Sequence, residues 1–438
     1  PRLERLGVAA VDRAAAALGA WFEPEFRGET APPAGSAEPD FTAFYVVHLP
    51  LGADLEGALA RFRALPEVAS ADPIAILPVE VVPNDSLWSV SYWYYTPQRH
   101  DIHAVEAWDV TTGDTSIVVA IVDTGVIPYH PDLGGTAAGL AGQIWTNWTE
   151  KPGTASQDLD GNGYAHDTWG WDFVNLAGPV GGDSLAYEDY HFEDNDPNDY
   201  AGHGTAVAGM AGALTNNTIG AAGTAWKVRI MPLRIGWATN SAPLGLVDMS
   251  YVAQAIRYAT RMGANVINCS FASLNLSGLD AAVAAATRAG IVVVAAAGNN
   301  GQPHYLGDRE DVISVAATNI SDVVPGFSNR GVYVDLAAPG VNIFSTYVKR
   351  TTVDSLGRRQ PAYPLPGYQL NGTSFSAPLV AGAVALMQAQ RGSQGLWPLT
   401  PMGALLRLRE TTDDISPYNT GITGYGTGRL NLYRALTG

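Results

Sequence analysis

Apolar-rich segments of strand length alternate with stretches of helical composition through most of the chain. Strands are predicted at 117–122, a continuous apolar run, and at 227–235, 265–269, 291–297, 312–317 and 332–337. Helices are predicted between them at 249–262 and 279–289. Strands that are apolar on both faces are typical of parallel sheets, which βα repeats bury beneath helices. The pattern therefore predicts an α/β fold, with a doubly wound, mainly parallel sheet and helices on both faces.

The N-terminal part of the chain has a different pattern. Its predicted elements are a helix at 3–18, a strand at 41–49, a helix at 54–65 and a strand at 68–76. An extended, proline-flanked tail follows at 77–83. This change of pattern predicts a small α+β domain over residues 1–83, followed by a larger α/β domain over residues 84–438.

Three short motifs carry candidate chemistry. The run at 117–122 ends in Asp123-Thr-Gly, and the carboxyl ends of buried parallel strands are where ligands bind in open α/β sheets. Helices of small residues open at Gly-His203-Gly and at Gly-Thr-Ser374. A serine on the first turn of a buried helix lies near unpaired N–H groups and the positive end of the helix dipole. Each motif alone also fits a structural role: a turn, a buried histidine or a helix N-cap.

Together, the motifs follow the order Asp, His, Ser that is found in subtilisin. A fourth motif ends in Ala-Gly-Asn299, and with it the chain resembles the subtilase family of serine proteases from about residue 84 to the C-terminus. The resemblance implies that Ser374 is the nucleophile, His203 the general base and then acid, and Asp123 the carboxylate that orients the imidazole. It also implies that the Asn299 amide and the Ser374 backbone N–H bind the oxyanion.

The resemblance extends to the substrate cleft and to the N-terminal domain. The residues implied to line the cleft are Ser270, Phe271, Ala272 and Ser273, with Ala297 and Gly298 as small walls of the S1 pocket. Residues 1–83 resemble a subtilase pro-domain, which assists folding and inhibits the enzyme until the junction, at about 76–86, is cut. An unrelated N-terminal domain is the alternative.

An Asp/Asn-rich loop is a candidate cation site. Oxygen side chains at alternate positions around glycines are typical of loops that wrap a hard cation, as at Asp158, Asp160 and Asn162. The loop resembles a calcium loop of some subtilases, which implies structural Ca²⁺ with the Tyr164 carbonyl and Asp167 as further ligands. An acidic turn without metal is the alternative. A second acidic segment, 193–199, is more typical of a solvated turn.

Composition narrows the possible partners and compartments. The net charge of −17 argues against nucleic acid and anionic membranes as partners. No apolar run reaches the ~18 residues of a membrane span. The single cysteine, Cys269, cannot form an intramolecular disulfide, and its apolar surroundings predict an inert core thiol. The sequence starts at Pro1 without methionine, so any signal peptide is expected to be absent from it already, and the family resemblance implies a secreted protein.

The leading hypothesis is a serine endopeptidase that hydrolyses protein or peptide substrates through an acyl-enzyme. A peptide ligase or macrocyclase on the same scaffold would differ only in whether an amine or water accepts the acyl group. A non-catalytic binding protein is disfavoured because all four catalytic positions are intact. An α/β-hydrolase esterase is disfavoured because the residues around Ser374 do not form Gly-x-Ser-x-Gly.

Overall fold

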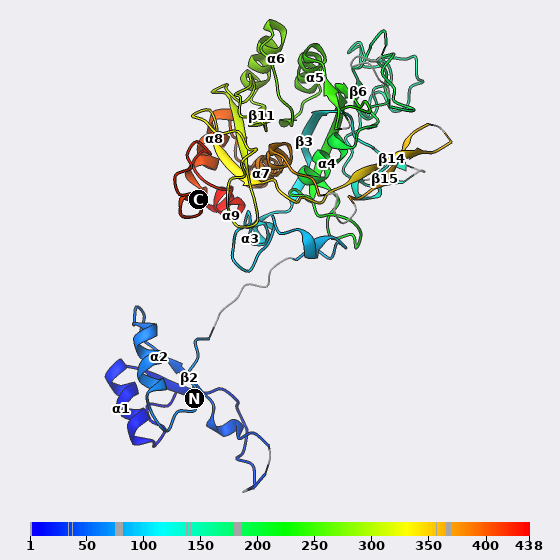
Figure 1. The fold of residues 1–438 in the computed structure, drawn as a ribbon. Helices are drawn as coiled ribbons and strands as arrows, with labels where there is room; N and C mark the ends of the chain where they lie inside the picture. Colours follow the sequence, from blue (N-terminus) through cyan, green and yellow to red (C-terminus); the bar gives the residue numbers. More distant parts are fainter. Residues whose placement is uncertain are drawn as a thin grey trace. The chain divides into compact units, whose positions relative to one another are not determined.

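The structure is a computed structural model that divides into two compact units, Pro1–Val79 and Glu80–Gly438. Figure 1 shows the elements of both units. We describe each unit by itself. The residues that the structure describes are 2–33, 35–36, 38–74, 82–136, 139–140, 142–178, 185–242, 244–355, 357–364 and 369–438.

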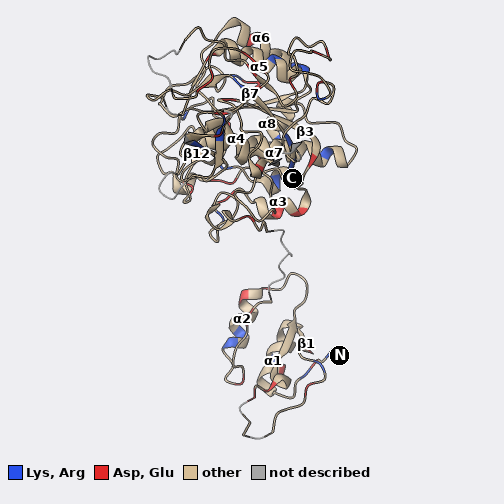
Figure 2. Cartoon of the chain, turned by 90° about the vertical axis from the view of Figure 1, so that its right-hand side faces the viewer, with Lys and Arg blue, Asp and Glu red and all other residues tan. Residues whose placement is uncertain are grey.

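The first unit combines two helices with a two-stranded antiparallel sheet. Its elements are α1 (Ala9–Leu18), β1 (Trp21–Pro24), the 3-10 turn η1 (Phe41–Ala43), β2 (Tyr45–His48) and α2 (Leu55–Arg63). Side chains from both helices and from β1 form its small core. Figure 2 shows an acidic first turn and a basic last turn in α2, an arrangement that complements the helix dipole.

One predicted helix in this unit starts too early, and one predicted strand is wrong. The helix predicted at 3–18 begins only at Ala9, because Gly7 has a left-handed φ of +81° and Leu3 pairs with Phe22 in a β-bridge. The described part of the strand predicted at 68–76 contains no strand. Instead, Arg63 Nε donates to the Ala71 carbonyl and folds this segment back beside α2. The predicted tail lies largely outside the described residues.

The second unit is built on a seven-stranded sheet whose neighbouring strands are all parallel. The strand order is β13-β12-β11-β10-β3-β7-β6. The strands are β3 (Gly113–Asp123), β6 (Trp171–Asp172), β7 (Lys227–Arg234), β10 (Val266–Cys269), β11 (Val292–Ala296), β12 (Val312–Thr318) and β13 (Leu336–Pro339). The predicted α/β fold is confirmed, although β13 begins later than the apolar run at 332–337 suggested.

Helices cover both faces of this sheet. They are α3 (Ala104–Val110), α4 (His203–Gly212), α5 (Met249–Arg261), α6 (Ser277–Arg288), α7 (Thr373–Ser393), α8 (Pro401–Glu410) and α9 (Leu432–Thr437). Along β3, Val119 and Ile121 belong to the core shared with α4 and α7, whereas Val118, Ala120 and Val122 belong to the core shared with α5 and α6. Figure 1 shows α5 and α6 side by side, in agreement with their many mutual contacts. This alternation explains why β3 is apolar on both faces.

Short elements connect the main layers. They are η2 (Trp88–Val90), η3 (Pro131–Leu133), β4 (Gly135–Thr136), β5 (Gly139–Leu140), β8 (Gly236–Trp237), β9 (Leu246–Val247), β14 (Tyr347–Val353), β15 (Arg359–Ala362) and η4 (Ser416–Tyr418). The strands β14 and β15 form an antiparallel hairpin in the connection between β13 and α7, which the sequence analysis did not predict. Among the described residues, no helix is both long enough and apolar enough to cross a membrane.

Candidate active site

Ser374 lies on the first turn of α7, a 21-residue helix that is buried almost all round. Pro378 sits inside this helix and has no N–H, so the Ser374 carbonyl lacks its usual helical partner. Ser270 Oγ donates to that carbonyl at 2.8 Å, and Ser374 Oγ donates to the Ser270 carbonyl at 2.9 Å. The first turn of α7 is therefore joined to the segment that follows β10.

His203 begins α4, and Asp123 is the last residue of β3. His203 Nδ1 donates to Asp123 Oδ1 at 2.7 Å, and the Asp123 side chain is buried. The backbone N–H of Thr124 donates to the same carboxylate oxygen at 2.8 Å. The His203 ring lies 5.5 Å, between centroids, from the ring of Phe375, which places it beside the first turn of α7. The structure thus brings two of the three predicted triad members into direct contact.

Electrostatics at this pair favour the charged imidazole. Burial by itself lowers the pKa of His203. The charge of Asp123 and its hydrogen bond act in the opposite direction, and the charge of Asp199 adds to them. The net result is a raised pKa for His203, so an imidazolium that forms there during a reaction is stabilised.

Asp199 is a fully buried carboxylate that the sequence analysis missed. Its two oxygens accept hydrogen bonds from the Thr124 hydroxyl, from the backbone N–H groups of Ala201 and Gly202, and from both the N–H and the hydroxyl of Thr205. It therefore connects the end of β3 with the turn that carries His203. The expectation of a solvated turn at 193–199 is wrong for Asp199. The available signal was an Asp shortly before a helix, a position typical of capping residues.

The Ser374 hydroxyl is hydrogen-bonded away from His203. Among the described residues, the Ser374 hydroxyl donates to the Ser270 carbonyl, and no hydrogen bond links it to His203. Rotation about the Ser374 Cα–Cβ bond changes this partner without moving the helix. Catalytic hydrogen bonds are often unformed in enzymes without substrate, so this geometry is compatible with a nucleophile at Ser374.

The Asn299 amide has a fixed orientation. Its Oδ1 accepts hydrogen bonds from Thr373 N at 3.0 Å and from Thr373 Oγ1 at 3.1 Å, which leaves Nδ2 as a donor. A β-carbon built at Gly372 would lie 3.4 Å from Asn299 Nδ2 and 3.7 Å from Ser374 N. Two nitrogen atoms that can donate hydrogen bonds, Asn299 Nδ2 and Ser374 N, therefore lie near one point beside Gly372.

The residues predicted to line the cleft lie after β10 and β11. Ser270 and Ser273 are buried, Phe271 is half-buried and Ala272 is exposed, while Ala297 is buried. Ser273 accepts hydrogen bonds from the backbone N–H groups of Tyr305 and Leu306, which tie the segment at 270–273 to the loop that follows β11. Gly298 has a φ of +101°, and a β-carbon there would lie only 2.4 Å from Asn329 Nδ2. A larger residue does not fit at this position.

Asn329 organises the turn that carries Asn299. Its Nδ2 donates to the Ala297 carbonyl at 2.9 Å and to the Gln302 carbonyl at 2.7 Å. Its Oδ1 accepts a hydrogen bond from Asn300 N at 3.0 Å. No local sequence signal indicated this role, because it depends on contacts with residues nearly thirty positions away.

The acidic loop gathers carboxylates of like charge. Oxygens of Glu150, Asp158 and Asp160 all lie within 4.8 Å of one another, and Glu150 is buried while the two aspartates are exposed. The sequence analysis missed Glu150, which is separated from the motif in the chain. Asn162 Oδ1 accepts a hydrogen bond from Tyr164 N at 2.7 Å, and its Nδ2 donates to Asp167 at 2.7 Å. The predicted ligands thus adjoin one another, with the three carboxylates at the centre.

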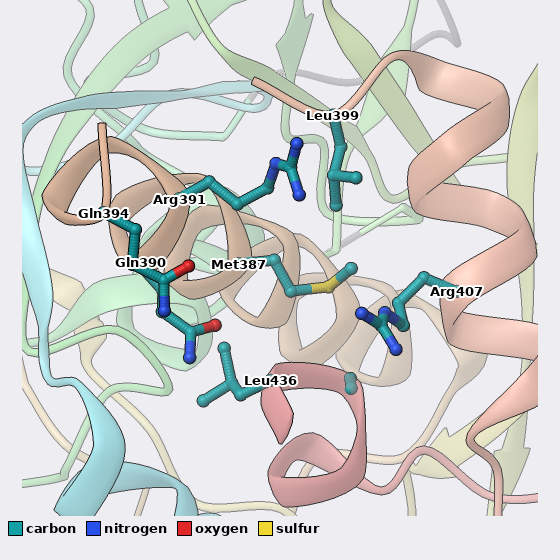
Figure 3. Close-up of a pocket in the computed structure, with 8 residues that line it drawn as sticks. Met387, Gln390, Arg391, Gln394, Leu399, Arg407 and Leu436 are labelled. Atoms are coloured by element: carbon teal, nitrogen blue, oxygen red, sulfur yellow. The ribbon is translucent and has the colours of Figure 1, made fainter. Parts of the chain in front are cut away.

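Figure 3 shows a small pocket at the far end of α7. It is lined by Met387, Gln390, Arg391, Gln394, Leu399, Arg407, Ala435 and Leu436. Met387 lies about 20 Å along the helix from Ser374 at the α-helical rise of 1.5 Å per residue. This pocket is therefore separate from the candidate active site.

Comparisons with known proteins agree with this geometry. The sequence profile of the subtilase family matches residues 114–426. The chain belongs to the subtilase family. It is 35% identical over 357 residues to thermitase of Thermoactinomyces vulgaris, covering 81% of this chain and 99% of thermitase. It is 30% identical over 406 residues to an extracellular protease of Xanthomonas campestris, covering 88% of this chain and 62% of that protein.

The fold is also found among solved structures. A protease from Pseudoalteromonas arctica is similar with a TM-score of 0.62 and 27% sequence identity, over 82% of this chain and 99% of that one. Like its relatives, this subtilase is a subtilisin-like serine endopeptidase.

Proposed function

We propose that this subtilase hydrolyses peptide bonds through an acyl-enzyme formed on Ser374, with His203 as the general base and Asp123 as its partner. The observation that carries this proposal is the 2.7 Å bond between His203 Nδ1 and the buried Asp123 carboxylate, beside the first turn of α7. This bond leaves His203 Nε2 to take the proton of Ser374 Oγ as the oxygen attacks the substrate carbonyl. The same proton then passes to the leaving amine, and water hydrolyses the ester.

Asn299 and the Ser374 backbone N–H stabilise the tetrahedral oxyanion in this mechanism. The anchoring of Asn299 Oδ1 by Thr373 supports the proposal, because it fixes Nδ2 before substrate arrives. Donors that are already oriented need no reorganisation as charge develops. A single donor of this kind contributes about 2.7–4 kcal/mol to transition-state stabilisation in subtilisin, another member of the family. The cleft residues at 270–273 and 297–298 bind the substrate beside these donors.

A calcium ion at the acidic loop stabilises the fold without entering the reaction. The residues fit a hard cation: Glu150, Asp158 and Asp160 bring three carboxylates together, and no salt bridge from a Lys or Arg to any of them is present among the described residues. Backbone N–H groups of Leu159 and His166 also bind Glu150 and orient it. We assign the ion to these carboxylates, with Asn162, Tyr164 and Asp167 as the remaining predicted ligands.

Residues 1–83 serve as a pro-domain that inhibits the catalytic unit and is removed by self-cleavage. Their separation into a compact unit with its own core supports this proposal. The name of the Xanthomonas relative supports action outside the cell. Incubation of the purified protein and mapping of new N-termini should find a cut between about 76 and 86 that is absent in Ser374→Ala. An active enzyme that keeps this segment attached, and that the isolated segment does not inhibit, would reject the pro-domain.

A cleavage assay tests the reaction class. The purified enzyme should cleave an unfolded protein, and a phosphonyl fluoride, which reacts with activated serines, should abolish that cleavage. A chelator added to a brief assay at moderate temperature should leave the rate unchanged. Cleavage that resists the serine reagent but stops at once with the chelator would point to a metal-dependent reaction and contradict the proposal.

A further inference from the structure

The β14–β15 hairpin interrupts the connection that leads to the nucleophile. This connection leaves the core at Ile343 and returns at Leu370, where the two backbones exchange hydrogen bonds of 2.9 and 3.0 Å. The strands β14 and β15 lie between these two residues. The helix α7, with Ser374 on its first turn, begins at Thr373, three residues after Leu370. The hairpin is therefore anchored to the segment that positions Ser374.

The base of the hairpin also contacts the turn that carries His203. Ser345 Oγ and Thr346 Oγ1 donate to backbone carbonyls of α4 at 2.8 and 2.6 Å. The ring of Tyr347 covers Gly202, so closely that a β-carbon at Gly202 would lie 2.8 Å from Tyr347 Cε2. Figure 1 shows the hairpin beside α4, in agreement with the contacts between α4 and β14.

A second contact from the hairpin reaches the residues just before His203. Arg359 is buried, and its guanidinium lies 5.9 Å from the ring centroid of Tyr200, while the guanidinium of Arg234 lies 5.3 Å from the same ring. Arg359 Nη2 also donates to the Ala186 carbonyl at 2.8 Å. Tyr200 follows Asp199, the buried carboxylate described above, so the hairpin contacts this turn at two points.

The third contact is with the loop that follows Asp123. Tyr129 Oη donates to the Arg359 carbonyl at 2.8 Å. His130 Nε2 donates to the Ala362 carbonyl at 3.0 Å, because its Nδ1 already accepts a backbone hydrogen bond. The guanidinium of Arg358 lies 4.7 Å from the ring centroid of Tyr129. The hairpin thus contacts the segments that carry Asp123 and His203, and the connection that contains it is anchored at Leu370, shortly before the segment that carries Ser374.

We propose that the β14–β15 hairpin is a brace that holds these segments in register, and that Tyr347 is a positioning residue for His203. The inference rests on the triad proposed above. The brace matters because a misplacement of about 1 Å between reacting groups can cost ~10²-fold in rate. Tyr347 acts through Gly202, the residue before His203, and it has no role in binding or in proton transfer.

The test compares kcat and KM for variants of the hairpin in the active enzyme. Tyr347→Ala should lower kcat for a short peptide amide by ~10- to 100-fold and leave KM nearly unchanged. The rate of phosphonylation of Ser374 by a small phosphonyl fluoride should fall in parallel, since this reagent does not fill an extended cleft. Tyr347→Phe keeps the ring over Gly202 and should restore both rates. Lys349→Ala, a matched control at an exposed position of β14, should behave as wild type.

Other outcomes separate the brace from simpler roles. A lowered melting temperature with an unchanged kcat would mean that the hairpin only stabilises the fold. A raised KM with an unchanged kcat would make it a wall of the substrate cleft, and either result overturns the proposal. If Tyr347→Ala does not fold, Arg359→Met carries the same test, because it keeps the aliphatic stem and loses the guanidinium over Tyr200. Substantial activity in Ser374→Ala, measured alongside, would reject the triad and not the brace.

Discussion

The helices α4 and α7 begin in similar ways, yet their first turns hold two catalytic candidates in different states. Each helix follows a glycine, Gly202 or Gly372, and each is buried along most of its length. His203 on α4 already makes its hydrogen bond to Asp123, whereas Ser374 on α7 donates to the Ser270 carbonyl. The proposed base is therefore already bonded to a carboxylate, whereas the proposed nucleophile donates to a backbone carbonyl.

The largest loss of kcat should come from disrupting the hydrogen bond between Asp123 and His203. Asp123→Asn replaces the charge that stabilises the imidazolium and favours the wrong tautomer of His203, so kcat should fall by ~10⁴-fold with little change in KM. Steady-state kinetics on a peptide amide measure the loss. A decrease of less than tenfold would show that Asp123 does not orient the base.

At the start of α7, the side chain with a fixed orientation is the proposed oxyanion donor, Asn299, and not the proposed nucleophile. Asn299→Ala removes the amide that Thr373 holds in place, and kcat should fall by ~10²–10³-fold while KM changes little. The neighbouring variant Asn300→Ala, which removes an exposed amide of the same turn, should stay far closer to wild type. A change confined to KM would mean that Asn299 binds substrate instead.

The negative charge of Asp199 should set the pH dependence of the reaction through the pKa of His203, the first residue of α4. It raises the pKa of His203, and His203 must be neutral to act as a base, so the acid limb of the profile of kcat/KM against pH reports this pKa. Asp199→Asn removes a negative charge, lowers the pKa of His203 and should therefore move the acid limb to lower pH. Glu193→Gln, which removes an exposed charge from the same acidic segment, should leave the limb in place. An acid limb that moves to higher pH, or does not move, contradicts this role.

Calcium binding should change the melting temperature of the protein but not the reaction carried out by the residues at the starts of α4 and α7. Chelation with EDTA should lower the melting temperature by roughly 1–2 °C for each kcal/mol of binding free energy that is lost, because the ion binds only the folded state. Asp160→Ala should largely remove the difference between melting curves with and without EDTA. At temperatures where the protein stays folded, kcat should not change. An unchanged melting curve in excess chelator would make the loop only a turn.

The sequence predicted the elements that combine a strong periodic pattern with a chemical motif. The strands β3 and β11 contain continuous apolar runs, and β10 is interrupted only by Asn268. Asp123 could be placed at the carboxyl end of β3 because it directly follows such a run. The entries to α4 and α7 were visible as glycine turns ahead of small, apolar helices. In these segments local composition and tertiary burial favour the same structure, so a local pattern was sufficient.

The remaining features depend on partners that are distant in the chain. Asp199 looks like part of an acidic turn until Thr124 and Thr205 enclose it, and Asn329 has no motif of its own. The strand predicted at 68–76 has strand composition but no neighbouring strand to pair with among the described residues. The hairpin at 347–362 does contain β-branched residues, but its function follows only from the segments that it contacts.

The central claim, that Ser374 is the nucleophile activated by His203, has one direct test. The wild-type enzyme is treated with a phosphonyl fluoride, digested and mapped by mass spectrometry, and the kcat of Ser374→Ala is measured in parallel. The account predicts a single adduct on Ser374, no adduct in the variant and a loss of ~10⁶-fold in kcat. An adduct on another serine, or a kcat within tenfold of wild type in Ser374→Ala, would contradict it.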